Sequence, residues 1–338
     1  MVAVLDFLAL VCFGLELLHF GLSFARGNLR ALAFVYRRVD QWLRYRLQQL
    51  AWLSFDYLVI RMAVAAWQSD AFSFWQALTV SAALLLLSFA LLYPLSFAWG
   101  LLIAPWCERR PIGHAIDRCL PSHARMSECW QELRNEYLVA AKRFGVIPSI
   151  DQILNDVSLI DEATPARARW TTIFLRCGGR DFPATLRHFP LLTRVIDSPR
   201  IVGALLSCLE PGVELKPHRG YFKGVLRYHL CLEVQDRELV WLIVDGQRYH
   251  WQAGEAIVFD DAYVHTAHNR SSHARVVLFL DVLRPLPRFL DTVNRAIAVY
   301  AGFHPFVGVL ERNVNRWAAH ANPDPSSQSL SAINPVKP

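Results

Sequence analysis

"LRYHL", residues Leu226–Leu230, lies within the stretch "GVLRYHLCLEV" (Gly224–Val234) and decides how the C-terminal part of the sequence folds. Successive residues of a β-strand point to opposite faces of the sheet. One face is then an ordinary apolar core face, made of Leu226, Tyr228, Leu230 and Leu232. The opposite face carries Arg227 and His229, so a guanidinium and an imidazole share one side of a strand and require a chemical partner.

The sequence around this strand predicts an all-β domain. Short strand-like runs begin at Trp170, and turn signals recur at "EPG", "VDGQ" and "WQAGE". The stretch "LVWLIVDGQRYHW" predicts a hairpin that turns at Asp245–Gly246, and "AIVF" and "RVVLFLDV" predict two further strands. This density of short strands favours a β-sandwich or a jelly roll.

The N-terminal third has a different composition. The chain has 338 residues, of which 54% are hydrophobic, and the apolar excess lies before Trp106. Ala71–Cys107 contains no charged residue and is longer than the about 20 residues that cross a bilayer. Val2–Phe24 is also long enough. Leu50–Trp67 contains two charges, each costing about 2.5–3.5 kcal/mol at a helix centre, and is marginal. We expect an α-helical membrane region with two or three transmembrane helices.

Charge and cysteine usage indicate the compartment. Arginines are concentrated between Arg26 and Arg46 and again at Arg109–Arg110, and basic loops stay in the cytoplasm. The sequence therefore predicts a multi-pass protein of the inner (cytoplasmic) membrane whose soluble domain faces the cytoplasm. The net charge of +6 comes without a nucleic-acid-binding motif, so we expect no nucleic-acid partner. The seven cysteines form no C-x-x-C pair, which indicates reduced thiols.

Several histidines and arginines fall on or beside the predicted strands. They are His218, Arg227, His229, His265 and Arg275. Taken singly, a strand histidine is more often a hydrogen-bonded structural residue, and an arginine more often a salt-bridge partner. Taken together they are harder to explain, because unpaired charge inside a sheet is costly. Neutral imidazoles suit Fe, Zn or Cu, and arginines bind carboxylates in a bidentate manner, so a metal with a dicarboxylate is the simplest interpretation.

Three stretches carry a resemblance to a known family: "PHRGYFKGVLRYHL", "VDGQRYHWQAGEAIVFDDAYVHTAHN" and "RVVLFLDVLRPLPRFLDTVNR". They resemble the aspartyl/asparaginyl β-hydroxylase family, in particular its bacterial membrane-bound branch, the lipid A 2-hydroxylases. The resemblance covers about residues 170–300. It implies a double-stranded β-helix of the jelly-roll or cupin-like type that depends on Fe(II), 2-oxoglutarate and O2. Such an enzyme oxidises 2-oxoglutarate to succinate and CO2 while it hydroxylates a C–H bond.

The resemblance also implies roles for single residues. His218 and His265 match the two iron ligands. Arg227 and His229 match the pair that holds the C1 carboxylate end of 2-oxoglutarate. Arg275 matches the arginine that binds the C5 carboxylate, and Ser207 matches the hydroxyl that assists it. The catalytic set implied in this way is His218, His265 and Arg275.

One position departs from the wider class of oxygenases. The acid of the 2-His-1-carboxylate triad normally stands two residues after the first histidine, and here that residue is Gly220. The peptide-acting members of the family also lack this acid, so the iron assignment is kept. Asp260 and Asp261 are expected to make turn and supporting hydrogen bonds rather than to bind iron. His268 should point to the other strand face, and no role is assigned to His250 or His273.

These inferences divide the chain into four regions. They are a membrane region at 1–107, a helical connecting region at 108–165, an oxygenase domain at 166–300 and an extension with a disordered tail at 301–338. Ser127–Phe144 is expected to form a surface helix. The predicted function is hydroxylation of the acyl chain of lipid A or a related membrane lipid such as an ornithine lipid. The alternatives are a peptidyl aspartyl/asparaginyl β-hydroxylase and a non-catalytic membrane sensor that binds 2-oxoglutarate.

Overall fold

The computed structural model describes residues 92–154, 164–165, 168–220 and 222–321, together with scattered positions between 54 and 80. The chain separates into two compact units at residues 102 and 103. Most of the predicted membrane region, and the predicted disordered tail after residue 321, lie outside the described residues. Within the described part, no helix is long and apolar enough to cross a bilayer. The helix α5 (Leu92–Ile103) covers 12 residues of the apolar stretch.

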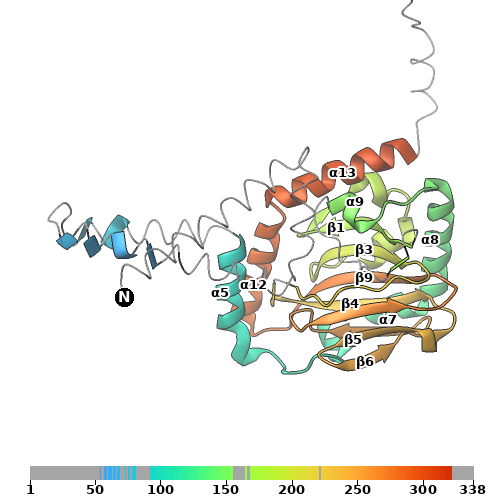
Figure 1. The fold of residues 1–338 in the computed structure, drawn as a ribbon, viewed down its shortest axis with the longest axis horizontal. Helices are drawn as coiled ribbons and strands as arrows, with labels where there is room; N and C mark the ends of the chain where they lie inside the picture. The colour runs from blue at the N-terminus through green and yellow to red at the C-terminus, as the bar shows by residue number, and fades with distance from the viewer. Residues whose placement is uncertain are drawn as a thin grey trace, which may run out of the picture. The chain divides into compact units, whose positions relative to one another are not determined.

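The second unit is built on a large antiparallel sheet (Figure 1). In spatial order its strands are β2 (Arg180–Asp181), β1 (Trp170–Cys177), β3 (Ile201–Leu209), β9 (Arg275–Leu283), β4 (Val225–Glu233) and β7 (Ala256–Phe259). The first strand of the sheet in the chain, β1, begins at the predicted residue. The strands β7 and β9 coincide, to within one residue, with the runs "AIVF" and "RVVLFLDV".

A second, smaller sheet contains β6 (Gln247–His250), β5 (Val240–Val244) and β8 (His265–Asn269). Its β5–β6 hairpin turns at Asp245 and Gly246, whose φ angles of 47° and 78° are those of a two-residue turn that favours Asp–Gly. Residues 212–218 run antiparallel to β8, with bridges from Glu214 to His268 and from His218 to His265. This pairing brings the "PHRG" segment alongside β8.

The two faces of the large sheet have different partners. Between the sheets, one apolar cluster joins residues of both, including Leu209, Cys231, Val277, Val240, Leu242 and Ala267. On the other face, helices cover a second cluster that contains Leu226, Tyr228, Leu230 and Leu232. The alternation predicted for β4 is therefore confirmed. A slip of one residue in its register would move Arg227 and His229 into the helix-covered core.

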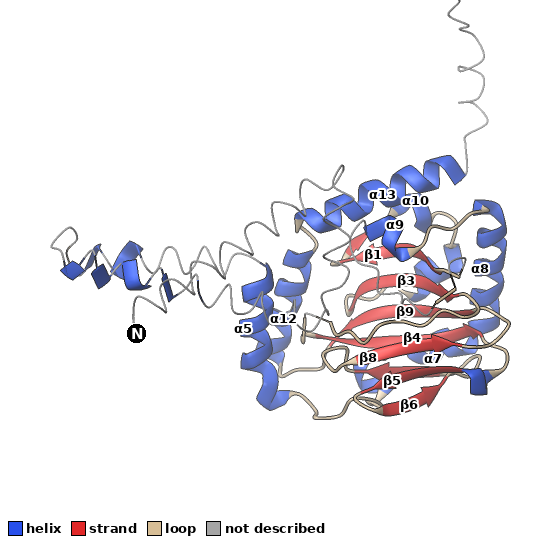
Figure 2. Cartoon of the chain, in the orientation of Figure 1, coloured by secondary structure: helices blue, strands red, loops and turns tan. Residues whose placement is uncertain are grey.

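The helices lie at the ends and on the outer side of the strands (Figure 2). They are η1 (Ala104–Trp106), α6 (Ile116–Cys119), α7 (His123–Glu128), α8 (Trp130–Phe144), α9 (Ile150–Leu154), α10 (Pro183–Leu186), α11 (Pro190–Val195), η2 (Arg237–Leu239), α12 (Arg288–Ala301) and α13 (Pro305–Ala321). The predicted surface helix corresponds to α7 and α8. Met126, Leu133 and Tyr137 of this pair pack against the large sheet.

Two facing antiparallel sheets with helices on one outer face make a mainly β, cupin-like jelly roll, as the sequence predicted. The six cysteines of the described part are all unpaired. Apolar packing on the faces of the sheet therefore holds the fold together, and disulfides contribute nothing within the described residues.

Candidate active site

The two predicted metal ligands lie side by side. His265 is the first residue of β8, and His218 ends the segment that pairs with it. The His218 amide donates to the His265 carbonyl at 3.0 Å, and the His265 amide donates back at 2.8 Å. The ring centroids are 4.2 Å apart. Residues that are 47 positions apart in the sequence thus present their imidazoles together between the sheets.

Both imidazoles are oriented by a backbone carbonyl two residues earlier. His218 Nδ1 lies 2.7 Å from the oxygen of Lys216, and His265 Nδ1 lies 3.0 Å from that of Tyr263. A carbonyl only accepts, so each Nδ1 carries the proton and each Nε2 keeps its lone pair. Burial is the main cause that lowers the pKa of both histidines to about 3. The neighbouring His265 ring lowers the pKa of His218 further, and the charge of Arg227 lowers the pKa of His265 further. Two neutral imidazoles with available Nε2 atoms suit a divalent transition metal.

A carboxylate stands beside this pair. Asp261 is buried, and its Oδ1 lies 3.2 Å from Nε2 of His265. A Cβ atom at position 220 would lie 1.7 Å from Asp261 Oδ2. Glycine is therefore required there, and the Asp261 carboxylate occupies the space in which the missing acid of the triad would begin. The sequence predicted only turn and supporting hydrogen bonds for Asp261, and its position against His265 is a finding of the structure.

Asp260 behaves as the sequence predicted. Its Oδ1 accepts the amide proton of Ala262 at 3.0 Å, which closes the turn, and its Oδ2 pairs with Arg284 at 2.8 Å. Within the described residues, no group of three or more His, Cys, Asp or Glu side chains is arranged to hold a metal. The donor set is thus two histidines with one nearby carboxylate.

Arg227 is held between two carboxylates. It lies 2.6 Å from Asp261 and 3.2 Å from Asp281, and its guanidinium stacks 4.3 Å from the centre of the Phe279 ring. Burial lowers the pKa of Arg227, but the two carboxylates raise it above the ordinary value. All three guanidinium nitrogens therefore face a carboxylate: Nε and Nη2 contact Asp281, and Nη1 contacts Asp261.

Arg275 is in the opposite situation. It begins β9 and is only 3% exposed, with its guanidinium 4.5 Å from the centre of the Trp251 ring. Its Nε and Nη1 atoms have no hydrogen-bond partner among the described residues. Burial lowers the pKa of Arg275 to about 10, which still leaves it charged at neutral pH. A buried, unpartnered guanidinium is costly, so the position calls for an anionic ligand.

His229 shares this property. It is buried on β4, and neither of its ring nitrogens has a hydrogen-bond partner within the described part of the chain. Its ring contacts Trp251, Phe259 and Phe279, with centroid distances of 6.1, 5.1 and 5.0 Å. Burial lowers the pKa of His229 well below its ordinary value, and the charge of Arg275 adds to the effect. His229 is therefore a neutral ring in an apolar surround.

The strand register puts these groups on one side of the large sheet. Arg227 pairs with Asp281, His229 with Phe279, and Ser207 with Val277, two residues from Arg275. Directly paired residues share a sheet face. We call this face, made of Ser207, Arg227, His229, Arg275 and Asp281, the inward polar face. The Oγ atom of Ser207 accepts a hydrogen bond from the Trp170 indole at 2.9 Å.

The three histidines that the sequence analysis set aside, His250, His268 and His273, lie elsewhere. His268 points to the outer side of β8, where it stacks on Trp241 and pairs with Glu214 at 3.4 Å. His250 contacts the Arg237 carbonyl and His273 contacts Asp236, both outside the inward polar face. Sequence reasoning missed Asp281. Its signal was the alternation of "RVVLFLDV", which puts residues 275, 277, 279 and 281 on one face.

Comparisons with known proteins show which family and relatives this chain is similar to. The profile of the family described as aspartyl/asparaginyl beta-hydroxylase matches residues 127–285. A curated relative, the ornithine lipid ester-linked acyl 2-hydroxylase of Rhizobium tropici, is 35% identical over 199 residues, which make up 58% of this chain and 69% of the relative. Aspartate beta-hydroxylase domain-containing protein 2 of Xenopus tropicalis and of Homo sapiens is 29% identical over 133 residues, which cover 36% of this chain and 35% of each relative.

Among solved structures, a cupin 2 conserved barrel domain protein from Salinispora arenicola aligns with 38% of this chain and 83% of its own, at 12% identity and a TM-score of 0.25. That likeness is too weak to support a conclusion about function. The sequence matches are stronger, because the family profile spans all nine strands and both paired histidines. The chain belongs to the aspartyl/asparaginyl β-hydroxylase family, near its bacterial lipid hydroxylases, and is a hydroxylase.

Proposed function

We propose that this chain is an Fe(II)- and 2-oxoglutarate-dependent hydroxylase that acts on the acyl chain of a membrane lipid. The observation that carries the proposal is the unpartnered, buried guanidinium of Arg275 on the same sheet face as the groups beside the paired histidines. The similarity to the Rhizobium tropici enzyme supports a lipid substrate and favours an ornithine lipid over lipid A.

The donor set fits iron. His218 and His265 would hold it through their Nε2 atoms, and Asp261 contributes a negative charge beside them. Neutral imidazole with an adjacent carboxylate is the donor chemistry of non-haem Fe(II) sites. Together with O2 and 2-oxoglutarate, iron bound there supplies the oxidising power that hydroxylation of an unactivated C–H bond needs.

The chain's own residues would bind and orient the cosubstrate. Arg275 offers two unpartnered donor atoms to a distal carboxylate, and the Ser207 hydroxyl lies on the same face. Near the paired histidines, His229 and Arg227 would contact the other carboxylate end of the cosubstrate. The rings of Phe259 and Phe279 line the space around His229 and exclude water, which strengthens each charged contact in the site.

We further propose that the chain is held in the inner membrane by its apolar N-terminal region, with the β domain in the cytoplasm. The arginine distribution supports this orientation. Anchoring would keep the site close to a substrate that is itself part of the bilayer, and Fe(II) and 2-oxoglutarate would be drawn from the cytoplasm.

Mass spectrometry of total lipids tests the substrate. A strain that carries the gene should contain one lipid class that is heavier by one oxygen atom on an acyl chain, and a strain without the gene should lack it. A strain complemented with the Arg275→Met variant serves as the control for expression. If the lipid profiles of all three strains are identical and a hydroxylated peptide is found, the substrate is a peptide and the proposed lipid substrate is wrong.

Metal analysis after anaerobic loading tests the iron site without relying on turnover. His218→Ala and His265→Ala should each lose stoichiometric iron, because each removes one of two protein ligands. His268→Ala is the matched control, since it removes an imidazole from the outer face of the same strand. Equal iron content in all four proteins would refute the assignment of the histidine pair.

A further inference from the structure

The helix α12 has two different faces. Asn294, Ile297 and Ala298 are buried against the domain. On the opposite side Phe289 is 78% exposed and Val299 is 42% exposed, and Phe303, in the turn that follows the helix, is 74% exposed. We call Phe289, Val299 and Phe303 the α12 apolar face. Large apolar side chains gathered on one exposed helix face indicate a surface that binds something.

This helix is fixed to the part of the chain that borders the candidate site. The Asn294 side chain donates a hydrogen bond of 2.7 Å to the carbonyl of Gly224, six residues after His218. Ala298 packs in a small cluster with Val225 and Leu283. These two residues pair with each other, two positions before Arg227 on β4 and two after Asp281 on β9. The orientation of the α12 apolar face is therefore set relative to the inward polar face.

The charges that flank the apolar face are positive. Arg288 and Arg295 are exposed, and neither has an ion pair among the described residues. The acidic residue of the helix, Asp291, is neutralised by Arg200 at 3.3 Å. A helix with aromatic and aliphatic residues on one side and arginines along one edge has the composition of helices that lie in the interface of an anionic bilayer.

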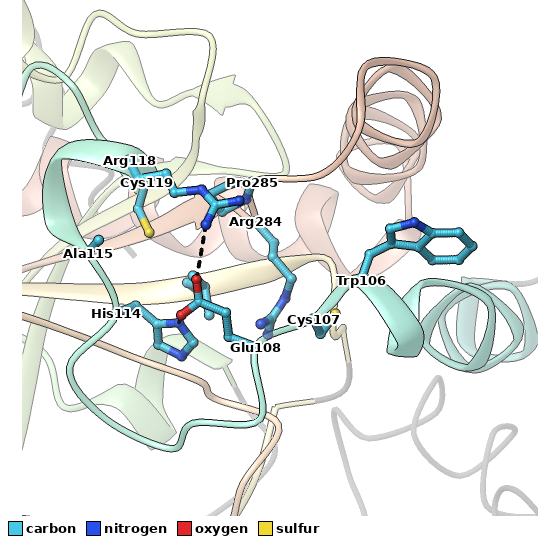
Figure 3. A pocket seen from close by; sticks show the side chains of 10 residues that line it. Trp106, Cys107, Glu108, His114, Ala115, Arg118, Cys119, Arg284 and Pro285 are labelled. Atoms are coloured by element: carbon cyan, nitrogen blue, oxygen red, sulfur yellow. Dashed lines mark hydrogen bonds and ion pairs between the residues drawn. The ribbon is translucent and has the colours of Figure 1, made fainter.

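Residues near the start of the second unit lie close to the residues that lead into α12. Figure 3 shows a pocket that is lined by Trp106 and Cys107, the last residues of the apolar N-terminal stretch, and also by Arg284 and Pro285, which lead into α12. Trp106 is 50% exposed, and indole rings are enriched where a protein meets the membrane surface. The end of the predicted membrane region and the beginning of α12 are thus neighbours within the same unit.

We infer that the α12 apolar face, with Arg288 and Arg295 along one edge, rests on the surface of a bilayer leaflet that contains anionic lipids. The inference rests on the proposed lipid hydroxylase and adds to it the side of the domain that meets the membrane. Contact through α12 brings the loop that follows His218 close to the leaflet.

The test uses the full-length chain in lipid nanodiscs of phosphatidylglycerol and phosphatidylethanolamine. The photoreactive residue p-benzoylphenylalanine replaces Phe289, Val299 or Phe303 in separate proteins. Val139, within α8, and Val146, two residues after its end, are the matched controls, because they are 71% and 73% exposed and α8 lies at the opposite end of the strands from α12 (Figure 1). Lipid adducts, detected by mass, are expected at the three α12 positions and not at the two α8 positions.

Other occupants of the face give other products. A cross-link to a second copy of the chain, or to another segment of the same chain, would overturn the assignment to the bilayer. Equal lipid labelling at α12 and α8 would overturn it as well. The readout is a lipid adduct and does not depend on turnover. If the α12 positions are labelled but no lipid is hydroxylated, the membrane contact through α12 stands and the proposed activity is refuted.

The charge of the leaflet is tested in the same system. A basic residue near an anionic surface contributes about 1 kcal/mol, which corresponds to about fivefold in binding. With the photoreactive residue at position 303, Arg288→Gln and Arg295→Gln should each lower the yield of lipid adduct by up to about fivefold. The same probe protein with both arginines intact should also give a lower yield in nanodiscs of phosphatidylcholine. A yield that is independent of lipid charge and of both arginines would overturn the anionic leaflet as the partner.

Discussion

The two arginines of the inward polar face, Arg227 and Arg275, differ in how their charge is balanced. Arg227 is enclosed by Asp261 and Asp281 and stacked on Phe279. Arg275 is more deeply buried than Arg227, yet it has two donor atoms without a partner among the described residues. One end of the face is thus neutralised by the protein itself, whereas the other carries an uncompensated charge.

This difference separates what the fold holds in place from what a ligand must complete. A buried ion pair with its hydrogen bonds made is stable as long as both partners remain. A buried charge without a partner lowers stability until an anion arrives. The histidine end of the site is therefore pre-organised, and the Arg275 end gains most from binding an anion.

The largest expected effect is on stability at the paired end. Arg227→Met leaves the buried Asp261 and the half-buried Asp281 without their cation. Because Asp261 is buried, the free energy of unfolding should fall by about 3–5 kcal/mol. The measurement is urea unfolding of the metal-free protein at pH 7.5.

Arg275→Met is the matched control, because it is the same substitution at the other arginine. It removes an uncompensated charge and should leave the free energy of unfolding unchanged or raise it. Equal destabilisation by both substitutions would show that the two arginines are balanced alike, and the contrast between the two ends would be lost.

The next effect is on cosubstrate binding at the unpaired end. Arg275→Met should lower the affinity for 2-oxoglutarate by more than about a hundredfold, since removal of one partner of a buried charge pair costs about 3–5 kcal/mol. Arg275→Lys keeps the charge but loses the planar fork, so it should fall between the two. Anaerobic titration calorimetry with 2-oxoglutarate measures all three proteins, and a wild-type affinity of Arg275→Met would mean that the distal carboxylate binds elsewhere.

A smaller effect is expected on the metal. Asp261→Asn keeps the shape of the side chain but removes the negative charge beside His265. It should lower the affinity for iron by roughly 10–100-fold. Glu214→Gln is the control, because it removes a carboxylate that pairs with His268 on the outer face of β8. Competition with a chromophoric chelator gives both affinities, and an unchanged value for Asp261→Asn would restrict this residue to holding Arg227.

The smallest effect is a pH dependence. The pKa of His229 is lowered in the folded chain, so below about pH 6.5 the unfolded chain takes up a proton that the folded chain does not. This part of the stability is present above pH 6.5 and is lost as the pH falls. Between pH 7.5 and pH 5.5 one such group accounts for about 1.4 kcal/mol. Denaturant unfolding at pH 7.5 and pH 5.5 measures how much unfolding free energy each protein loses on acidification. The loss should be smaller in His229→Leu than in the wild type by about 1.4 kcal/mol. Equal losses would mean that His229 is protonated in the folded chain at pH 5.5.

Much of the fold was predictable because its signals are local. The two-residue alternation of "LRYHL" set both faces of β4, and Asp245–Gly246 set the β5–β6 hairpin. The family resemblance pointed to His218 and His265, which the structure brings together across a bridge. The position of Asp261 was not predictable. It depends on the absence of a side chain at Gly220, and nothing local to either residue reports their contact.

By itself, the sequence determined which residues alternate on each strand, where the hairpin turns and which histidine faces away from the site, because these follow from backbone geometry within a few residues. Only the tertiary structure decided that Arg227 is paired and Arg275 is not. Both are arginines on apolar strands, and their difference arises from the register of β4 and β9, which brings Asp281 opposite Arg227, and from the turn that carries Asp261 to the same guanidinium. Charge balance inside a protein is a sum over neighbours in space, and that sum depends on contacts between residues far apart in the chain.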